Sequence, residues 1–177
     1  MPGGAVHRLV CLPHAGGSAS VFKEWGSNLP GIEVQAVRCP GRAERIDERS
    51  PTDLHHLAFE IADTFDPSDE RPKALFGHGM GALVALEAAR VFQAGGTRLA
   101  HLFASGTRNA ASYPSPAEAE NLTTGAFFEH LVRGDHFYLH SEPPYAPIRK
   151  SLNVKITSRK DSLMQAKRDV TLTWENP

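Results

Sequence analysis

The residues with the clearest chemical pattern stand in one stretch, Gly77-His78-Gly79-Met80-Gly81, between the apolar residues 74–76 and an alanine-rich run. A glycine-rich corner between a buried strand and a helix has the layout of a nucleophile elbow, G-x-S-x-G, whose middle residue carries the attacking hydroxyl. The outer glycines let the helix approach the strand, and the middle residue takes a backbone conformation that disfavours side chains. Gly79 occupies that middle position, so the pattern predicts the turn of a nucleophilic hydrolase without its hydroxyl.

Regular elements on either side of this turn must position it. A first helix is expected after Ser18 or Ser20, either of which could cap it. Two more helices are expected over 54–65 and from Met80 to about Gln93, where Gly95-Gly96 gives a stop signal. Strands are expected at 7–12, 32–37, 74–76 and 99–104. Strands separated by helices imply right-handed crossovers and a mostly parallel sheet, so we expect an α/β fold with helices on both faces.

The composition of the chain is that of an ordinary globular protein. Its 177 residues are 41% hydrophobic with a formal net charge of -1, which fits one domain and indicates neither a nucleic-acid nor a membrane partner. No secretory signal or spanning run is visible, so we expect a cytoplasmic protein. Cys11 and Cys39 are interpreted as buried thiols rather than a disulfide. The histidines show no metal-ligand spacing, and the glycines lack the G-x-G-x-x-G spacing of dinucleotide sites, so no metal or cofactor is expected.

Five stretches, in one order along residues 7 to 140, make the chain resemble the type II thioesterases. These proteins are α/β-hydrolases that accompany polyketide synthases and nonribosomal peptide synthetases. The stretches are Leu12-Pro13-His14-Ala15-Gly16-Gly17-Ser18-Ala19, Arg38-Cys39-Pro40-Gly41-Arg42, Phe76-Gly77-His78-Gly79-Met80-Gly81-Ala82-Leu83, Phe103-Ala104-Ser105-Gly106 and Gly134-Asp135-His136-Phe137-Tyr138-Leu139.

The resemblance implies a role for each matching position. Gly79 stands where the family has its nucleophilic serine, and His136 would be the general base. The backbone N–H groups of Ala15 and Met80 would form the oxyanion hole. By the same likeness, the substrate is an acyl thioester on phosphopantetheine, and the partner is an acyl or peptidyl carrier protein.

The chain departs from that family at three points. Gly79 supplies no hydroxyl, and His136 follows it by only 57 positions, so the lid and the strand end that carries the triad aspartate are largely missing. Neither Asp161 nor Asp169 can be assigned as a substitute. Residues 1–140 are therefore predicted to form a truncated hydrolase domain. Residues 141–177 are predicted to be a divergent tail packed on or extending it, irregular around its prolines, with half-exposed strands at 152–157 and 170–174.

Several alternatives remain open at this level. His78 and His14 are interpreted as structural, Ser105 as a serine not used as a nucleophile, and the basic residues of the tail as a solvated face or a carrier contact. The chain is either a thioesterase-like hydrolase impaired at Gly79 or a non-catalytic module, a pseudoenzyme, that binds acyl groups or carriers. In a third possibility, loss of the block before His136 leaves the core incomplete and the chain poorly folded.

Overall fold

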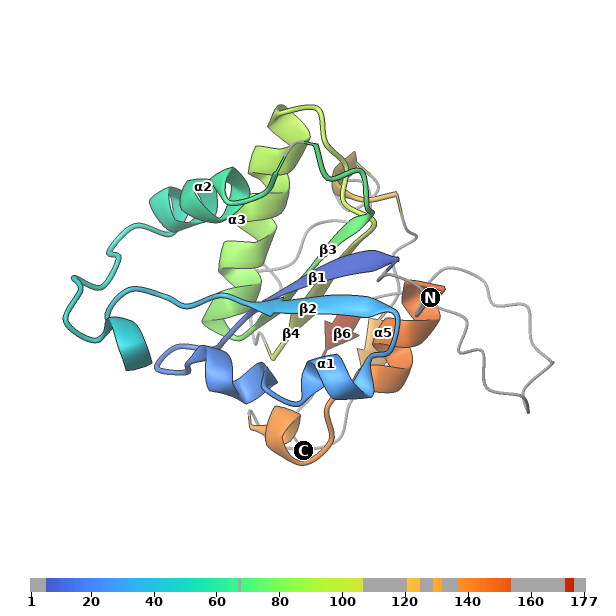
Figure 1. Ribbon diagram of the computed structural model, residues 1–177, viewed down its shortest axis with the longest axis horizontal. Helices are drawn as coiled ribbons and strands as arrows, with labels where there is room; N and C mark the ends of the chain where they lie inside the picture. Colours follow the sequence, from blue (N-terminus) through green and yellow to red (C-terminus); the bar gives the residue numbers. More distant parts are fainter. Residues whose placement is uncertain are drawn as a thin grey trace.

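Four parallel strands form the central sheet of the computed structural model, which describes residues 6–66, 68–106, 121–124, 129–131, 137–153 and 171–173 (Figure 1). The register pairs Leu12 with Gly77 and His78 with Ser105, so the carboxyl ends of three strands meet at one edge. The expected parallel sheet is confirmed. Its order is β2-β1-β3-β4, with β1 at His7–Leu12, β2 at Ile32–Ala36, β3 at Lys73–His78 and β4 at His101–Ser105.

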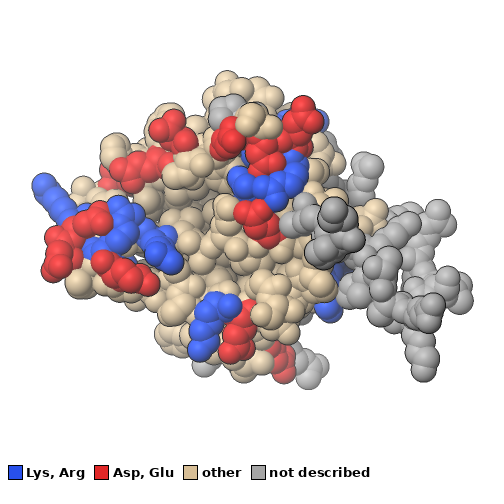
Figure 2. Space-filling view, viewed as in Figure 1, with Lys and Arg blue, Asp and Glu red and all other residues tan. Residues whose placement is uncertain are grey.

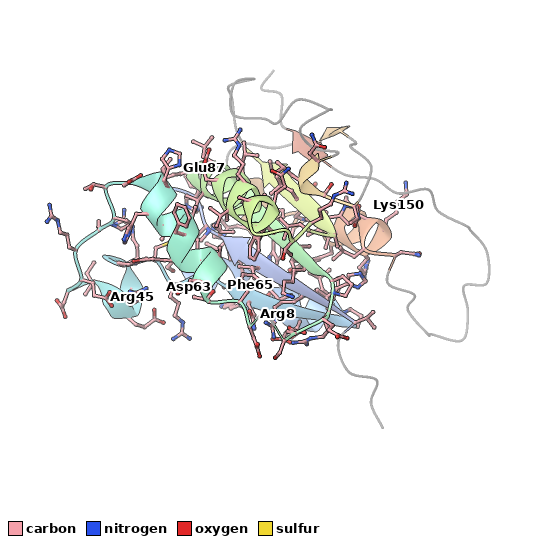
Figure 3. All side chains as sticks on the ribbon, turned by 90° about the horizontal axis from the view of Figure 1, so that it is seen from above. Arg8, Arg45, Asp63, Phe65, Glu87 and Lys150 are labelled. Carbon is pink, nitrogen blue, oxygen red and sulfur yellow. The ribbon has the colours of Figure 1, made fainter. Side chains whose placement is uncertain are left out.

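Both faces of the sheet are covered. Side chains of a strand alternate between faces, and in β1 Val10 and Leu12 point to one cluster of buried residues while Leu9 and Cys11 point to the other. Figure 3 shows α2, Leu54–Asp63, and α3, Met80–Ala94, lying together over one face. Phe22, Trp25 and Ile148 fill the cluster on the opposite face. Helices on both faces, as predicted, explain why the strands read as nearly continuous apolar runs.

Helix α2 confirms the helix predicted from residue 54 and has a capped start. Asp53 is its N-cap, and the Asp53 carboxylate accepts a hydrogen bond from the backbone N–H of His55 at 2.9 Å. Helix α3 ends at Gly95, and the next residue, Gly96, has φ of +81°, the left-handed conformation typical of a helix C-terminus.

The first predicted helix is divided into two short pieces. A 3-10 turn covers Ala19–Phe22, and α1 covers only Trp25–Asn28, because Gly, Ser and Asn after Trp25 are weak helix formers. The proposed serine cap is wrong. Ser18 precedes the 3-10 turn but its hydroxyl bonds the Ser20 hydroxyl at 2.7 Å rather than a backbone N–H.

The segment after residue 140 is more regular than its prolines suggest. Helix α5 spans Tyr145–Ser151, with Pro144 at the N-cap and Pro147 in the first turn, where no intrahelical N–H bond is lost. The predicted strand at 152–157 is wrong at its start, since Leu152 caps α5, and residues 154–157 lie outside the described part. Strand β6, Thr171–Thr173, confirms the last predicted strand and pairs in parallel with β5, Glu129–Leu131.

The described tail residues join the core of the first part of the chain. Ile148 and Leu152 are 0% and 2% exposed, in the cluster that contains Trp25 and Phe76. Cys11 is a free buried thiol, as expected, whereas Cys39 is free but only half-buried. The division of the chain at residue 140 stays a prediction.

On the face shown in Figure 2 the charged residues lie in small separate groups, several of which contain both signs. At the amino edge of the sheet, Arg8 contacts Asp69 at 3.0 Å, and Arg71 pairs with both Asp69 and Glu33. On the loop after β2, Arg45 is paired with Glu48 at 2.5 Å. Figure 3 places Arg45 and Lys150 at opposite ends of the molecule, so the basic residues of this loop and of α5 form no shared surface.

Candidate active site

The glycine-rich stretch forms a sharp corner at the carboxyl end of β3. Gly79 is the N-cap of α3, with φ of +56° and ψ of -120°, outside the regions that residues with side chains normally occupy. Its backbone N–H donates to the Ser105 carbonyl oxygen at 2.7 Å, and its own carbonyl accepts from the Ala82 N–H at 3.0 Å. The predicted strand–turn–helix geometry of an elbow is thus present, with Gly79 at its apex.

The outer glycines are required by close packing. A Cβ on Gly77 would lie 2.5 Å from the Ala82 Cα, and a Cβ on Gly81 would lie 2.5 Å from the Pro13 carbonyl oxygen. These separations are shorter than any real contact of a Cβ atom. Gly77 therefore lets α3 approach β3, and Gly81 lets it approach the loop that follows β1.

That loop carries the first candidate oxyanion donor. Ala15 is exposed in a turn closed by the Gly17 N–H, which donates to the His14 carbonyl at 2.9 Å. Because the backbone at Pro13 contacts the first turn of α3, the structure brings the Ala15 loop against the elbow. Met80 is the first residue of α3, where backbone N–H groups have no carbonyl partner within the helix. No measured contact joins Ala15 to Met80, so their shared role stays a prediction.

A buried polar network lies beside Gly79. The Nδ1 atom of His78 is 3.0 Å from the Ser105 hydroxyl oxygen, which is 2.5 Å from the Tyr138 hydroxyl oxygen. The three residues are 1%, 1% and 2% exposed. The sequence indicates a structural role for His78 and a serine not used as a nucleophile at Ser105, and it gives no role to Tyr138, although all three belong to the stretches that carry the family resemblance. Each of the three residues stands in a different one of these stretches, and this pattern is the sequence signal that could have pointed to the network.

His136 lies outside the described residues, as do Asp161 and Asp169, so the proposed general base and the missing acid stay untested. The described chain resumes at Phe137, which is 55% exposed. Its ring meets the ring of His14 edge to face, with 5.6 Å between centroids, and His14 meets His78 in the same way at 5.9 Å. The residue bonded to His136 therefore lies at the carboxyl edge of the sheet, beside the elbow.

Within the described ranges, no group of three or more histidine, cysteine or acidic side chains could hold a metal ion, and no helix is long and apolar enough to cross a bilayer. An open hollow of about 610 Å³ lies between α2 and the end of α3, lined by residues that include Phe59, Phe65 and Phe92. None of the elbow residues lines that hollow.

The thioesterase domain family matches residues 7–114, which contain the Ala15 loop and the elbow. The chain belongs to the thioesterase domain family. It is 42% identical over 118 residues to the "Probable cadicidin biosynthesis thioesterase" of Streptomyces griseus, covering 66% of this chain and 32% of that protein. It is 41% identical over 128 residues to the gramicidin S biosynthesis protein GrsT of Aneurinibacillus migulanus, covering 71% of this chain and 50% of that one.

Solved thioesterases share the fold. The type II thioesterase BorB from the borrelidin biosynthetic cluster superposes with a TM-score of 0.68 at 26% identity, over 84% of this chain and 92% of that one. The α/β-hydrolase fold and the resemblance to type II thioesterases of polyketide and nonribosomal peptide pathways are confirmed. The chain spans about a third to a half of the length of the curated relatives it matches.

Proposed function

We propose that this chain acts on acyl thioesters carried by the phosphopantetheine arm of a carrier protein, as a thioesterase-like hydrolase impaired at Gly79. The observation that carries the proposal is the elbow itself: Gly79 at φ +56° and ψ -120°, between β3 and α3, with the Ala15 loop packed against it. A glycine at this corner retains the backbone of the site and removes only the nucleophile.

Two backbone N–H donors would still support hydrolysis of a thioester in the absence of the serine. The N–H groups of Ala15 and Met80 would bind the oxygen of a thioester carbonyl, and each such donor is worth about 3 kcal/mol in the transition state of related enzymes. Without an attacking hydroxyl, a water molecule deprotonated by His136 would attack the carbonyl directly and release the thiol. Enzymes stripped of their triad retain roughly a thousandfold acceleration over water, so slow hydrolysis is the expected limit.

A second function is favoured by the same glycine. A site that binds the acyl group and its carrier without turning it over would need the elbow and the two donors but no nucleophile. Both functions predict binding of an acylated carrier, and only the hydrolase predicts turnover that depends on His136.

The test compares three proteins on acyl thioesters of N-acetylcysteamine and on an acylated carrier protein: the chain as it stands, Gly79→Ser, and Gly79→Ser combined with His136→Ala. In subtilisin, loss of the serine costs about 2 × 10⁶ in kcat and loss of the aspartate about 3 × 10⁴. A site that regains its serine but lacks its acid should therefore gain about a hundredfold in turnover.

The control is Gly26→Ser, which adds the same side chain on α1, where a Cβ has no neighbour within 4 Å. A gain with Gly79→Ser that His136→Ala abolishes, and that Gly26→Ser lacks, supports the hydrolase. No turnover by any variant, with the acylated carrier still bound, rejects the hydrolase and leaves the binding module. Failure to bind the carrier or its thioester rejects both.

A further inference from the structure

The His78–Ser105–Tyr138 network joins three parts of the chain that are distant in sequence. His78 ends β3 beside the elbow, Ser105 ends β4, and Tyr138 begins a short 3-10 helix at Tyr138–His140. The Ser105 hydroxyl bridges the other two, at 3.0 Å from the His78 Nδ1 and 2.5 Å from the Tyr138 hydroxyl oxygen. With all three side chains at most 2% exposed, water cannot substitute for these bonds without entering the core.

The backbone around the network is built to accommodate it. His78 and Ser105 are register partners in neighbouring parallel strands, so their side chains emerge side by side on one face of the sheet. Gly106 follows with φ of +65°, and a Cβ there would lie 2.7 Å from the His78 Nδ1. The imidazole of His78 thus occupies the space that any larger residue at position 106 would need.

A second contact holds the same segment. The ring of Phe137 meets the ring of His14, which lies in the loop after β1, and the rings of His78 and Tyr138 meet edge to face at 5.6 Å. Two consecutive residues, Phe137 and Tyr138, are therefore fixed against the loop after β1 and against the end of β4. Phe137 is peptide-bonded to His136, the expected general base.

We propose that Tyr138 is a positioning residue: its hydroxyl, held by Ser105 and through it by His78, anchors Phe137 and Tyr138 at the carboxyl edge of the sheet, and loosening that anchor alters the neighbouring His136. The role of His136 rests on the proposed function, whereas the tie itself rests on the contacts above. The network explains why a histidine next to the nucleophile position, a serine at the end of the neighbouring strand and a tyrosine after the general base occur together. None of the three touches the substrate in this account.

A purely structural role makes a different prediction. Buried polar bonds stabilise a fold wherever they lie, so removing one would lower the melting temperature without affecting His136. Ser151 provides a matched control, because it is 4% exposed and its hydroxyl donates to the Pro147 carbonyl at 2.8 Å within α5. Ser105→Ala and Ser151→Ala each remove one buried serine hydroxyl, and only the first belongs to the network.

The first measurement reads His136 directly and requires no activity. Proton NMR of the ring Cε1–H signals follows the histidines of the full chain, with the His136 signal assigned by its loss in His136→Gln. Tyr138→Phe and Ser105→Ala are expected to move the His136 signal and its titration midpoint, and Ser151→Ala to leave both in place. A His136 signal and midpoint unchanged in both network variants overturns the proposal.

The second measurement reads the consequence in the Gly79→Ser background. Displacing a catalytic group by about 1 Å can cost a hundredfold, so Tyr138→Phe should lower kcat by about tenfold to a hundredfold at nearly constant KM. Because the network acts as one unit, Tyr138→Phe combined with Ser105→Ala should lower kcat no further than Ser105→Ala alone. Ser105→Thr, which restores a hydroxyl, should recover part of the loss, and Ser151→Ala should match the Gly79→Ser parent.

The two measurements separate this inference from the function on which it rests. If Gly79→Ser shows no turnover while the His136 signal moves as expected, the positioning role stands and the hydrolase proposal fails. If Gly79→Ser turns over and Tyr138→Phe and Ser105→Ala leave kcat unchanged, the hydrolase stands and the positioning role fails. Loss of the folded spectrum in both network variants also overturns it, because the residues would then serve general stability.

Discussion

Replacing Gly79 with serine should make this protein less stable, even though it restores the residue expected of an active enzyme. Gly79 has φ of +56° and ψ of -120°, a conformation that glycine adopts freely and residues with a Cβ adopt only under strain. A residue held in such a sparsely populated region costs about 1–3 kcal/mol. The elbow is fixed by the Gly79 N–H bond to Ser105 and by the close packing of Gly77 and Gly81, so the backbone cannot relax to relieve that strain.

The expected change in melting temperature follows from the size of the chain. For a domain of 150–250 residues, 1 kcal/mol shifts the midpoint by about 2–4 °C, so Gly79→Ser should melt about 2–12 °C below the parent. Thermal and urea unfolding followed by circular dichroism give both the midpoint and the free energy of unfolding. Serine substitutions at two other glycines serve as controls for the change in melting temperature. Gly26→Ser introduces the side chain into open space at a helical φ, and Gly16→Ser introduces it into open space at φ of +78°.

Gly26→Ser should be neutral or slightly stabilising, because serine has the higher helix propensity, whereas Gly16→Ser should be destabilised by its positive φ alone. A Gly79→Ser variant as stable as the parent would refute this reasoning, since it would mean that the corner does not hold residue 79 in the strained conformation. The same outcome would weaken the assignment of an elbow.

Three further perturbations test the fold around the site. Gly81→Ala should lower the free energy of unfolding, measured by urea titration, by about 1–3 kcal/mol, because its Cβ would lie 2.5 Å from the Pro13 carbonyl oxygen. An unchanged urea midpoint would show that α3 lies farther from the loop after β1. Phe76→Ala removes a 0% exposed side chain packed against Trp25 and should lower the free energy of unfolding by about 3–5 kcal/mol. Phe59→Ala, at a 61% exposed side chain, should change that free energy by less than about 0.5 kcal/mol. Equal losses of stability in the two variants would contradict the assigned core. Hydrogen bonds and ion pairing from Arg71 hold the pKa of Asp69 well below its usual range, so the Asp69 carboxylate stabilises the fold above its unfolded pKa of about 3.9 and loses that contribution as the pH falls below it. Asp69→Asn should therefore flatten the decline of the melting temperature between pH 5 and pH 2. A decline as steep as that of the parent would reject this role of Asp69.

The core of the fold was predictable because its signals are local. Apolar runs such as 7–12 and stop signals such as Gly95-Gly96 each act within a few residues, and the structure confirms them. The parallel arrangement followed from the alternation of strands and helices, since a crossover between parallel strands needs a helix-length connection.

The errors fell where local signals compete. Prolines at 143, 144 and 147 were interpreted as irregular chain, yet the first turn of a helix tolerates proline, and burial of Ile148 stabilises α5. The alternating pattern at 152–157 resembled a strand, but Leu152 completes the packing of α5 on the sheet. Tertiary contact decided both cases, and a single sequence does not reveal it.

The site was predictable in its backbone and not in its side-chain network. Glycine spacing located the elbow, and the structure gave Gly79 the conformation that the pattern requires. The link from His78 through Ser105 to Tyr138 crosses two strand ends and a distant segment, so only the register of β3 and β4 shows why these residues meet. The roles of Ala15, Met80 and His136 stay predictions.

The most direct test of the central claim is covalent trapping at the elbow. Gly79→Ser and the parent chain are treated with an alkyl fluorophosphonate, which reacts with a serine hydroxyl when the oxyanion donors and a base are in place, and intact mass followed by peptide mapping locates the adduct. We expect one adduct per chain at position 79 in Gly79→Ser, its loss when His136→Ala is added, and no adduct on the parent or on Gly26→Ser. A folded Gly79→Ser protein that takes up no label would contradict the claim that this chain retains the oxyanion donors and the base of a thioesterase site.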